Sequence, residues 1–277
     1  MKRYLKHSNK KQIWRILISE TDKLVIEERD PKTREVFFSC YELSTKAKIF
    51  SNFQFEEKAW IGIEAVEKDI IVFHFYLKPD MPQHKGFFAY DLKQKKILWR
   101  NETLTYFFSD NEKIVAFQQQ FEGRFYVEIK LQTGEVIRNL GEDYTLVNSL
   151  NEEVRAKKSY DDYLFPEVFN PLIDEPQFDC IRNSVSRFSV SGRVEYFQNG
   201  DFLFFTFHEK KDEKFIQHFY ICTTADGSLF YSDVLNKNIK DYAVDSFFFY
   251  KKFLFLLKEK QIVEIFKMNI YMRMLCF

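Results

Sequence analysis

Short apolar runs recur along the whole chain, and charged or turn residues separate them. Each run is about five to eight residues long, too short for a typical helix, and is rich in β-branched or aromatic side chains that suit a pleated strand. The pattern predicts an all-β fold. Clear examples are Trp14–Ile18, Leu24–Glu28, Val36–Leu43, Ile70–Tyr76, Gly86–Leu92, Ile114–Gln118, Phe125–Leu131, Phe202–His208, Phe219–Thr223 and Phe253–Leu257.

Two of these runs, Ile70–Phe73 and Phe202–Phe205, are apolar at every position instead of alternating. A strand of this kind is covered on both faces. Few helical patterns lie between the runs, so other sheets must supply the cover, as the stacked blades of a β-propeller do. We therefore predict a β-propeller-like fold of antiparallel strands, with a β-sandwich as the alternative.

A repeated hairpin supports the propeller interpretation. An aromatic-rich strand, a polar turn and a second apolar strand recur from Phe37, Phe87, Phe125 and Phe219. The ends of the first strands lie 49, 39 and 93 residues apart, and the last interval is read as two units. A period of ~45 residues is what a four-stranded blade requires, which predicts five to seven blades.

The polar turn of the repeat has one special position. Gly134 and Gly227 occupy it in the last two copies, where a positive φ is usually required. We assign Ala47 and Lys95 to the same position in the first two copies, so the repeat is degenerate.

Residues 151–191 break the strand pattern. This stretch holds three prolines and an acidic-aromatic segment from Tyr160 to Asp179. The spacing of its apolar positions predicts a short amphipathic helix, and these positions are Phe178, Ile181, Val185 and Phe188. We expect a single domain over residues 1–277, with a helix and loop insertion near 160–190 and a tail over about 267–277.

The balance of charged residues limits the kinds of partner that we expect this chain to bind. The chain has 41 basic and 41 acidic residues, so its electrostatics do not favour nucleic acid or an acidic membrane. No run approaches the roughly 20 apolar residues of a membrane helix. The apolar run Ile13–Ile18 is too short for a signal peptide. We expect a cytoplasmic monomer with no nucleic-acid or membrane partner.

The four cysteines, Cys40, Cys180, Cys222 and Cys276, are far apart and form no paired motif. A disulfide-stabilised fold is normally denser in cysteine. We expect reduced and mostly buried thiols.

The loop Lys78–Gly86 is the densest polar feature. It carries Asp80 and His84, and His74 lies a few residues upstream. These residues could contact a small ligand or a metal, but one His and one Asp fall short of the three protein ligands of a typical zinc site. The favoured interpretation is a proline-stiffened hairpin loop, so we assign no metal and no cofactor.

His208 is a further candidate because Glu209 follows it, and a His beside a carboxylate can act as a general base. More often such a pair ends a strand and enters a solvated charged turn, here Lys210–Lys214. His218 stands alone in a strand and is interpreted as structural. The residues to test for catalysis are His74, Asp80, His84 and His208.

The segment Tyr90-Asp91-Leu92 with Leu98-Trp99 resembles a blade of the pyrroloquinoline-quinone-type propellers. The resemblance concerns the blade alone and implies neither that family's cofactor nor its activity. Most of the chain, to about Glu264, also resembles an uncharacterised bacterial family, a domain of unknown function, which implies no activity and no catalytic residues. The segments that carry this likeness are Arg34–Ser39, Phe53–Glu57, Lys78–Gly86 and Val194–Phe197.

The motifs of common enzyme classes are missing from the sequence. GxSxG, HExxH, GxxxxGK[ST] and GxGxxG do not occur. We therefore favour a non-enzymatic binding or scaffold module that contacts a protein or a small molecule at the faces of the propeller. The alternative is a hydrolase or lyase at the central channel, which requires the four candidate residues to converge.

Overall fold

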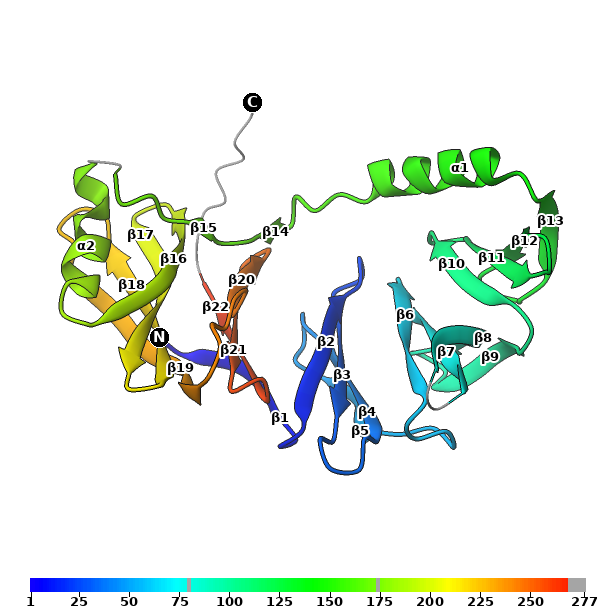
Figure 1. Ribbon diagram of the computed structural model, residues 1–277, viewed down its shortest axis with the longest axis horizontal. Helices are drawn as coiled ribbons and strands as arrows, with labels where there is room; N and C mark the ends of the chain where they lie inside the picture. Colours follow the sequence, from blue (N-terminus) through cyan, green and yellow to red (C-terminus); the bar gives the residue numbers. More distant parts are fainter. Residues whose placement is uncertain (79–80, 173–174, 269–277) are drawn as a thin grey trace. The chain divides into compact units, whose positions relative to one another are not determined.

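The computed structural model describes residues 1–78, 81–172 and 175–268. Within these ranges strands dominate and form five antiparallel sheets, which confirms the all-β prediction (Figure 1). Most of the expected tail, residues 269–277, lies outside the described residues.

The chain divides into two compact units. One unit holds residues 11–159, and the other holds residues 1–10 together with residues 160–277. The single domain expected from the sequence stays a prediction.

The unit of residues 11–159 contains three four-stranded sheets, and in each of them every strand pairs with the next along the chain. The first sheet consists of β2 (Gln12–Ile18), β3 (Lys23–Arg29), β4 (Val36–Glu42) and β5 (Lys48–Phe53). The second consists of β6 (Ile61–Glu67), β7 (Ile70–Lys78), β8 (Met81–Asp91) and β9 (Lys96–Asn101). The third consists of β10 (Thr105–Ser109), β11 (Lys113–Gln119), β12 (Arg124–Lys130) and β13 (Val136–Gly141).

The other unit contains two five-stranded sheets. One runs in the order β15 (Glu167–Val168), β16 (Val190–Asn199), β17 (Phe202–Lys211), β18 (Lys214–Thr223) and β19 (Leu229–Ile239). The other runs in the order β1 (Arg3–Ser8), β22 (Ile262–Lys267), β21 (Phe253–Lys258), β20 (Phe247–Tyr250) and β14 (Tyr163–Leu164). The N-terminal strand β1 thus completes a sheet of C-terminal strands through its antiparallel pairing with β22.

Strand β7 is covered on both faces, as its unbroken apolar run predicted. Ile71 and Phe73 pack into a core with residues of β3 and β4. Ile70 and Val72 point the other way and pack with residues of β11 and β12. Each fully buried side chain of this size contributes about 1.5–3 kcal/mol, so the middle sheet is held from both sides.

The second run with two apolar faces, Phe202–Phe205, is covered differently. Phe204 packs against residues of β20 and β21. On the opposite face Leu203 and Phe205 pack against Ile181 of α2 (Asp179–Val185), so a helix takes the place of the expected second sheet.

The helix expected in the insertion is present but shorter than its apolar spacing suggested. A 3-10 turn, η1 (Pro176–Phe178), leads into α2, which ends at Val185 before Phe188. A longer helix, α1 (Tyr144–Lys157), was not predicted. Its one fully buried residue is Val147, which packs with Phe117 and Tyr126 of the third sheet, and the partly buried Leu146 and Leu150 pack against the same core.

The turns of the four hairpin copies share one backbone feature. Lys46, Lys95, Gly134 and Gly227 all have positive φ, at 64°, 53°, 74° and 67°. The assignment of Ala47 to this position was therefore wrong by one residue. The turn of the first copy has the same geometry as that of the third: Glu42 N–H bonds to the carbonyl of Ala47, as Lys130 N–H bonds to that of Glu135, and the residue before the acceptor is left-handed in both.

Cys40, Cys180 and Cys222 are buried free thiols, as expected, and Cys276 lies outside the described residues. In the described residues no helix combines the length and the apolar character needed to cross a bilayer.

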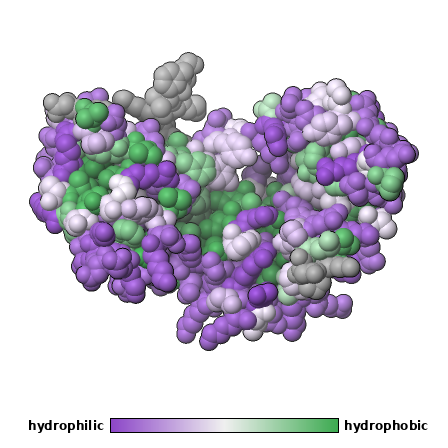
Figure 2. Space-filling view, viewed as in Figure 1, coloured by the Kyte–Doolittle hydropathy of each residue, from purple (hydrophilic) through white to green (hydrophobic). Residues whose placement is uncertain are grey.

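The insertion contributes exposed apolar residues. Phe165, Val168 and Leu172 are all exposed, and Leu172 is 88% accessible. Figure 2 shows further hydrophobic residues gathered over α2 and β16 of the same unit.

Candidate functional site

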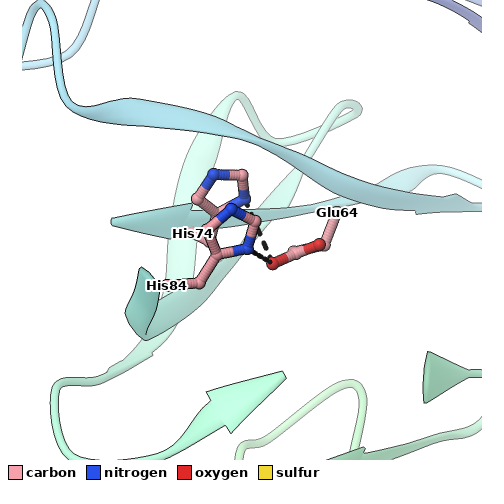
Figure 3. A group of neighbouring side chains, drawn as sticks. All are labelled: Glu64, His74 and His84. Carbon is pink, nitrogen blue, oxygen red and sulfur yellow. Dashed lines mark hydrogen bonds and ion pairs between the residues drawn. The ribbon is translucent and has the colours of Figure 1, made fainter. Parts of the chain in front are cut away.

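Three side chains of the second sheet meet at one point, and they are Glu64, His74 and His84 (Figure 3). Glu64 Oε1 lies 3.2 Å from His74 Nδ1 and 2.7 Å from His84 Nδ1. One ligand atom from each residue lies within 4.8 Å of the other two. The residues come from β6, β7 and β8, which are adjacent in the sheet.

Glu64 reaches this point because it is the extra residue of a β-bulge. Ile63 pairs with Phe73 and Ala65 pairs with Val72, so Glu64 has no partner of its own in β7. A bulge re-aims a side chain away from the regular alternation of a strand.

His74 lies against the backbone of β6, opposite Gly62. A Cβ atom at residue 62 would lie 2.7 Å from His74 Cε1 and 2.9 Å from His74 Nε2, which real Cβ atoms essentially never do. Glycine at this position is therefore what allows the imidazole to lie flat on the strand.

His84 is brought alongside by an irregularity between β7 and β8. His74 pairs with Phe87 while Tyr76 pairs with His84, and Gly86 at φ 77° takes up the extra residue. The two imidazole rings stack with centroids 3.6 Å apart and planes 9° apart. Tyr76 meets both rings edge-on at 5.0 Å.

Glu64, His74 and His84 differ in how many hydrogen bonds they form. His84 Nδ1 donates a hydrogen bond to Glu64 Oε1, since an ionised carboxylate only accepts. His74 Nδ1 lies 3.2 Å from the same oxygen but forms no hydrogen bond with it. In the part of the chain that the structure describes, neither ring nitrogen of His74 has a hydrogen-bond partner, although the residue is only 2% exposed.

The environment sets the charges. Burial alone would raise the pKa of Glu64, but the neighbouring imidazoles of His74 and His84 outweigh this effect and lower the pKa of Glu64 to about 2. Burial lowers the pKa of His74, and Glu64 offsets this only in part. At neutral pH Glu64 is ionised and His74 is neutral.

The structure brings together two of the four residues that the sequence singled out, His74 and His84. Asp80 lies outside the described residues. His208 belongs to β17 in the other unit, where its Nε2 accepts a hydrogen bond from the backbone N–H of Ala243 at 3.1 Å. That bond ties His208 to the segment between β19 and β20.

His218 is not alone, as the sequence suggested. Its Nε2 lies 3.0 Å from Glu209 Oε2 of the neighbouring strand. Among the described residues, no third metal-ligating side chain lies close enough to this pair to complete a metal site.

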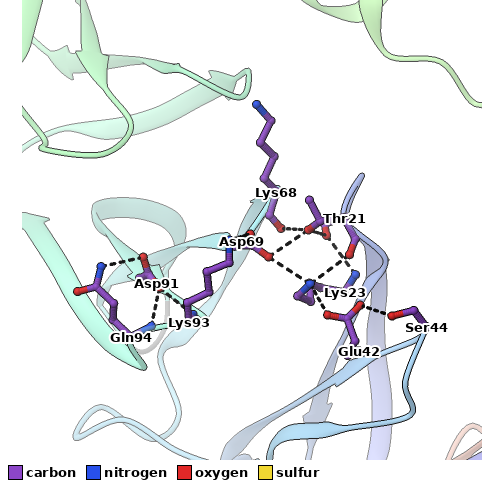
Figure 4. Close-up of polar contacts among 10 residues, drawn as sticks. Thr21, Lys23, Glu42, Ser44, Lys68, Asp69, Asp91, Lys93 and Gln94 are labelled. Carbon is purple, nitrogen blue, oxygen red and sulfur yellow. Dashed lines mark hydrogen bonds and ion pairs between the residues drawn. The ribbon is translucent and has the colours of Figure 1, made fainter.

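A second polar cluster joins the first and second sheets (Figure 4). Lys23 Nζ lies 2.5 Å from Glu42 Oε2 and 3.2 Å from Asp69 Oδ1, and Lys93 Nζ lies 2.7 Å from Asp69 Oδ2. Burial would raise the pKa of Asp69, but its two lysine neighbours lower it overall. Each acid here has a basic partner, so the cluster acts as a polar tie between sheets.

Residues 18–99, which include all three members of the Glu64 cluster, match the family described as Domain of unknown function (DUF4905). Comparison with curated proteins gives no match.

Solved structures align over most of the chain at low similarity. Hsv2 of Kluyveromyces marxianus is 11% identical with a TM-score of 0.31, and the alignment covers 93% of this chain and 76% of that one. The protein lmo1340 of Listeria monocytogenes is 12% identical with a TM-score of 0.33, over 89% and 75% of the two chains. The acylaminoacyl peptidase of Pyrococcus horikoshii is 9% identical with a TM-score of 0.31, over 94% and 39%. Because these scores are low, we transfer no property of these proteins to this chain.

Proposed function

We propose that this chain is a binding module and that Glu64, His74 and His84 form its ligand-binding centre. The observation that carries the proposal is the convergence of two imidazole nitrogens, of His74 and His84, on one carboxylate oxygen of Glu64. Such clusters of titratable groups with perturbed pKa values are typical of functional sites.

The position of the cluster supports this role. Its members project from three hydrogen-bonded strands of a sheet that is packed on both faces, so the site is held by rigid elements. The side chain of His84 is 33% exposed, while those of Glu64 and His74 are 14% and 3% exposed. A ligand therefore approaches from the side of His84.

We further propose that the sheets of both units are blades of a β-propeller-like fold. Two features support this architecture: neighbouring sheets within each unit pack face to face, and β1 pairs with β22 so that the two ends of the chain share one sheet. The proposed setting is a cytoplasmic monomer, in keeping with the balanced charge and the free thiols.

The test is a ligand panel with a local readout. The full chain, labelled with ¹⁵N on histidine, is exposed to divalent metal ions, small carboxylates, phosphate and short peptides, and its ring resonances are recorded. We expect at least one class to shift His74 and His84 and to leave His218 unmoved. A panel that shifts no ring resonance, or shifts His218 alone, contradicts the proposal.

A hydrolase or lyase is the second candidate, favoured by the partly exposed His84 beside an ionised Glu64. Such a pair can transfer a proton, and a positioned acid or base contributes about 10²–10⁴-fold in rate. If this candidate holds, wild-type protein cleaves simple esters or phosphoesters and Glu64→Gln loses most of that rate. Equal rates in the two proteins contradict it.

A further inference from the structure

The cluster is built from the donor atoms of a transition-metal site. It offers two imidazole nitrogens and one carboxylate oxygen, all within 4.8 Å of one another. Nitrogen donors suit zinc-like ions, whereas magnesium and calcium prefer oxygen alone. Three protein ligands and an open position are the usual arrangement of an accessible zinc site.

The burial of His74 also points to a ligand. His74 is almost fully buried, and its two ring nitrogens lack hydrogen-bond partners within the described residues. A buried polar group left without a partner costs about 1–3 kcal/mol, so native proteins rarely keep one without a use. An ion at the cluster would satisfy the ring through Nδ1, the nitrogen nearest to Glu64.

The surroundings of His74 fix which nitrogen faces the ion. The Nε2 side of the ring is closed by the backbone at Gly62, where even a Cβ atom would come within 2.9 Å. Nδ1 is therefore the ring nitrogen that is left to face an ion at the cluster.

We propose that Glu64, His74 and His84 together bind one divalent transition-metal ion of the zinc type. This inference rests on the proposed function, because it names the ligand of the same centre. His74 is the fixed ligand, held by Gly62 and Tyr76. His84 is the adjustable one: its stacked ring has to turn away from His74 for both Nδ1 atoms to reach a common ion, and its exposure leaves room for this movement.

The experiment uses the full chain after treatment with a chelator. Co²⁺ serves as the spectroscopic probe, Zn²⁺ as the competitor, and calorimetry gives the stoichiometry. We expect one Co²⁺ per chain, visible absorption typical of nitrogen and oxygen ligands, displacement by Zn²⁺, and no displacement by excess Mg²⁺.

Variants locate the ion. Loss of a directly bound ligand should weaken binding by more than the ~10–100-fold seen for outer-shell changes, so His84→Ala and Glu64→Gln should each weaken it at least ~100-fold. His84→Ala is the primary variant because a partly exposed residue can be removed without unfolding, and circular dichroism checks the fold. His218→Ala removes a histidine that also contacts a glutamate and should leave binding unchanged.

The inference is overturned if the folded wild type binds no stoichiometric Co²⁺, if His84→Ala binds as tightly as wild type, or if His218→Ala loses the ion. The histidine resonances separate this failure from that of the proposed function. If phosphate or a carboxylate shifts the resonances of His74 and His84 while Co²⁺ does not bind, the metal inference is wrong but the proposed binding function stands. If no ligand shifts those resonances, both the metal inference and the proposed function are wrong.

Discussion

Trp99 of β9 reaches the next sheet and bonds to Leu131: its indole Nε1 donates a 2.8 Å hydrogen bond to the Leu131 carbonyl oxygen. The ring also covers Gly134, where an added Cβ would lie 2.6 Å from Trp99 Cδ2. One side chain therefore ties the second sheet to the turn between β12 and β13 of the third.

Replacing this glycine should separate the two sheets. Gly134→Ala places a side chain at φ 74° and against the indole ring, so we expect a loss of at least about 2 kcal/mol in the free energy of unfolding. Urea denaturation measures it. Gly141→Ala is the matched control, because Gly141 also has positive φ but nothing lies within 4 Å of its added Cβ. Equal losses in the two variants would show that the Trp99 contact contributes nothing.

The turn at Lys95 carries strain that a glycine would remove. Lys95 has φ 53°, a left-handed conformation that costs a non-glycine residue about 1–2 kcal/mol. Because glycine also gains chain entropy on unfolding, Lys95→Gly should raise the free energy of unfolding by only about 0.5–1 kcal/mol. Lys96→Gly, one residue later in β9, should lower it. A fall in stability for Lys95→Gly contradicts the assigned turn.

Acid should weaken the polar tie at Asp69. Its pKa is lowered in the folded state, so its contribution to stability is complete above the unfolded pKa of about 3.9 and is lost as pH falls through the folded value. Asp69→Asn should be less stable than wild type at pH 7, and the difference should shrink towards pH 2–3. Urea midpoints across this range measure the difference. Glu56→Gln, at an exposed position, serves as the control, and a constant difference at all pH values would rule out the Asp69 contribution.

Removing β1 should expose an edge of the C-terminal sheet. β22 lies between β1 and β21, so deletion of residues 1–8 leaves one side of β22 unpaired. Exposed edge strands template association between chains, and we expect the truncated protein to form oligomers. Size-exclusion chromatography with light scattering reports the mass. Deletion of Met1 and Lys2 alone, which precede β1, should change nothing. A truncated protein that remains a stable monomer would show that β1 is not needed to protect the edge of β22.

The coarse fold was predictable because it follows from burial. The unbroken run Ile70–Phe73 required cover on both faces, and the structure provides it with two other sheets. The layer that covers Leu203 and Phe205 is the helix α2 and not a second sheet. This difference was not predictable, because the apolar content of a strand does not reveal whether a helix or a sheet covers it.

The candidate site was only half predictable. His74 and His84 stood out by residue type, but Glu64 lay in a strand where regular alternation gives no sign of a bulge. A one-residue irregularity depends on pairing with a neighbouring strand, and a single sequence does not reveal that register. The spacing of ten residues from Glu64 to His74 and from His74 to His84 is the one signal that could have suggested three adjacent strands.

Anomalous diffraction at the zinc absorption edge, from crystals of the full chain grown with one equivalent of Zn²⁺, tests the binding centre most directly. We predict one strong peak bonded to Glu64, His74 and His84 at roughly 2.0–2.2 Å from each ligand atom. A map with no peak at these three residues, or with its strongest peak at His218 and Glu209, would contradict the account.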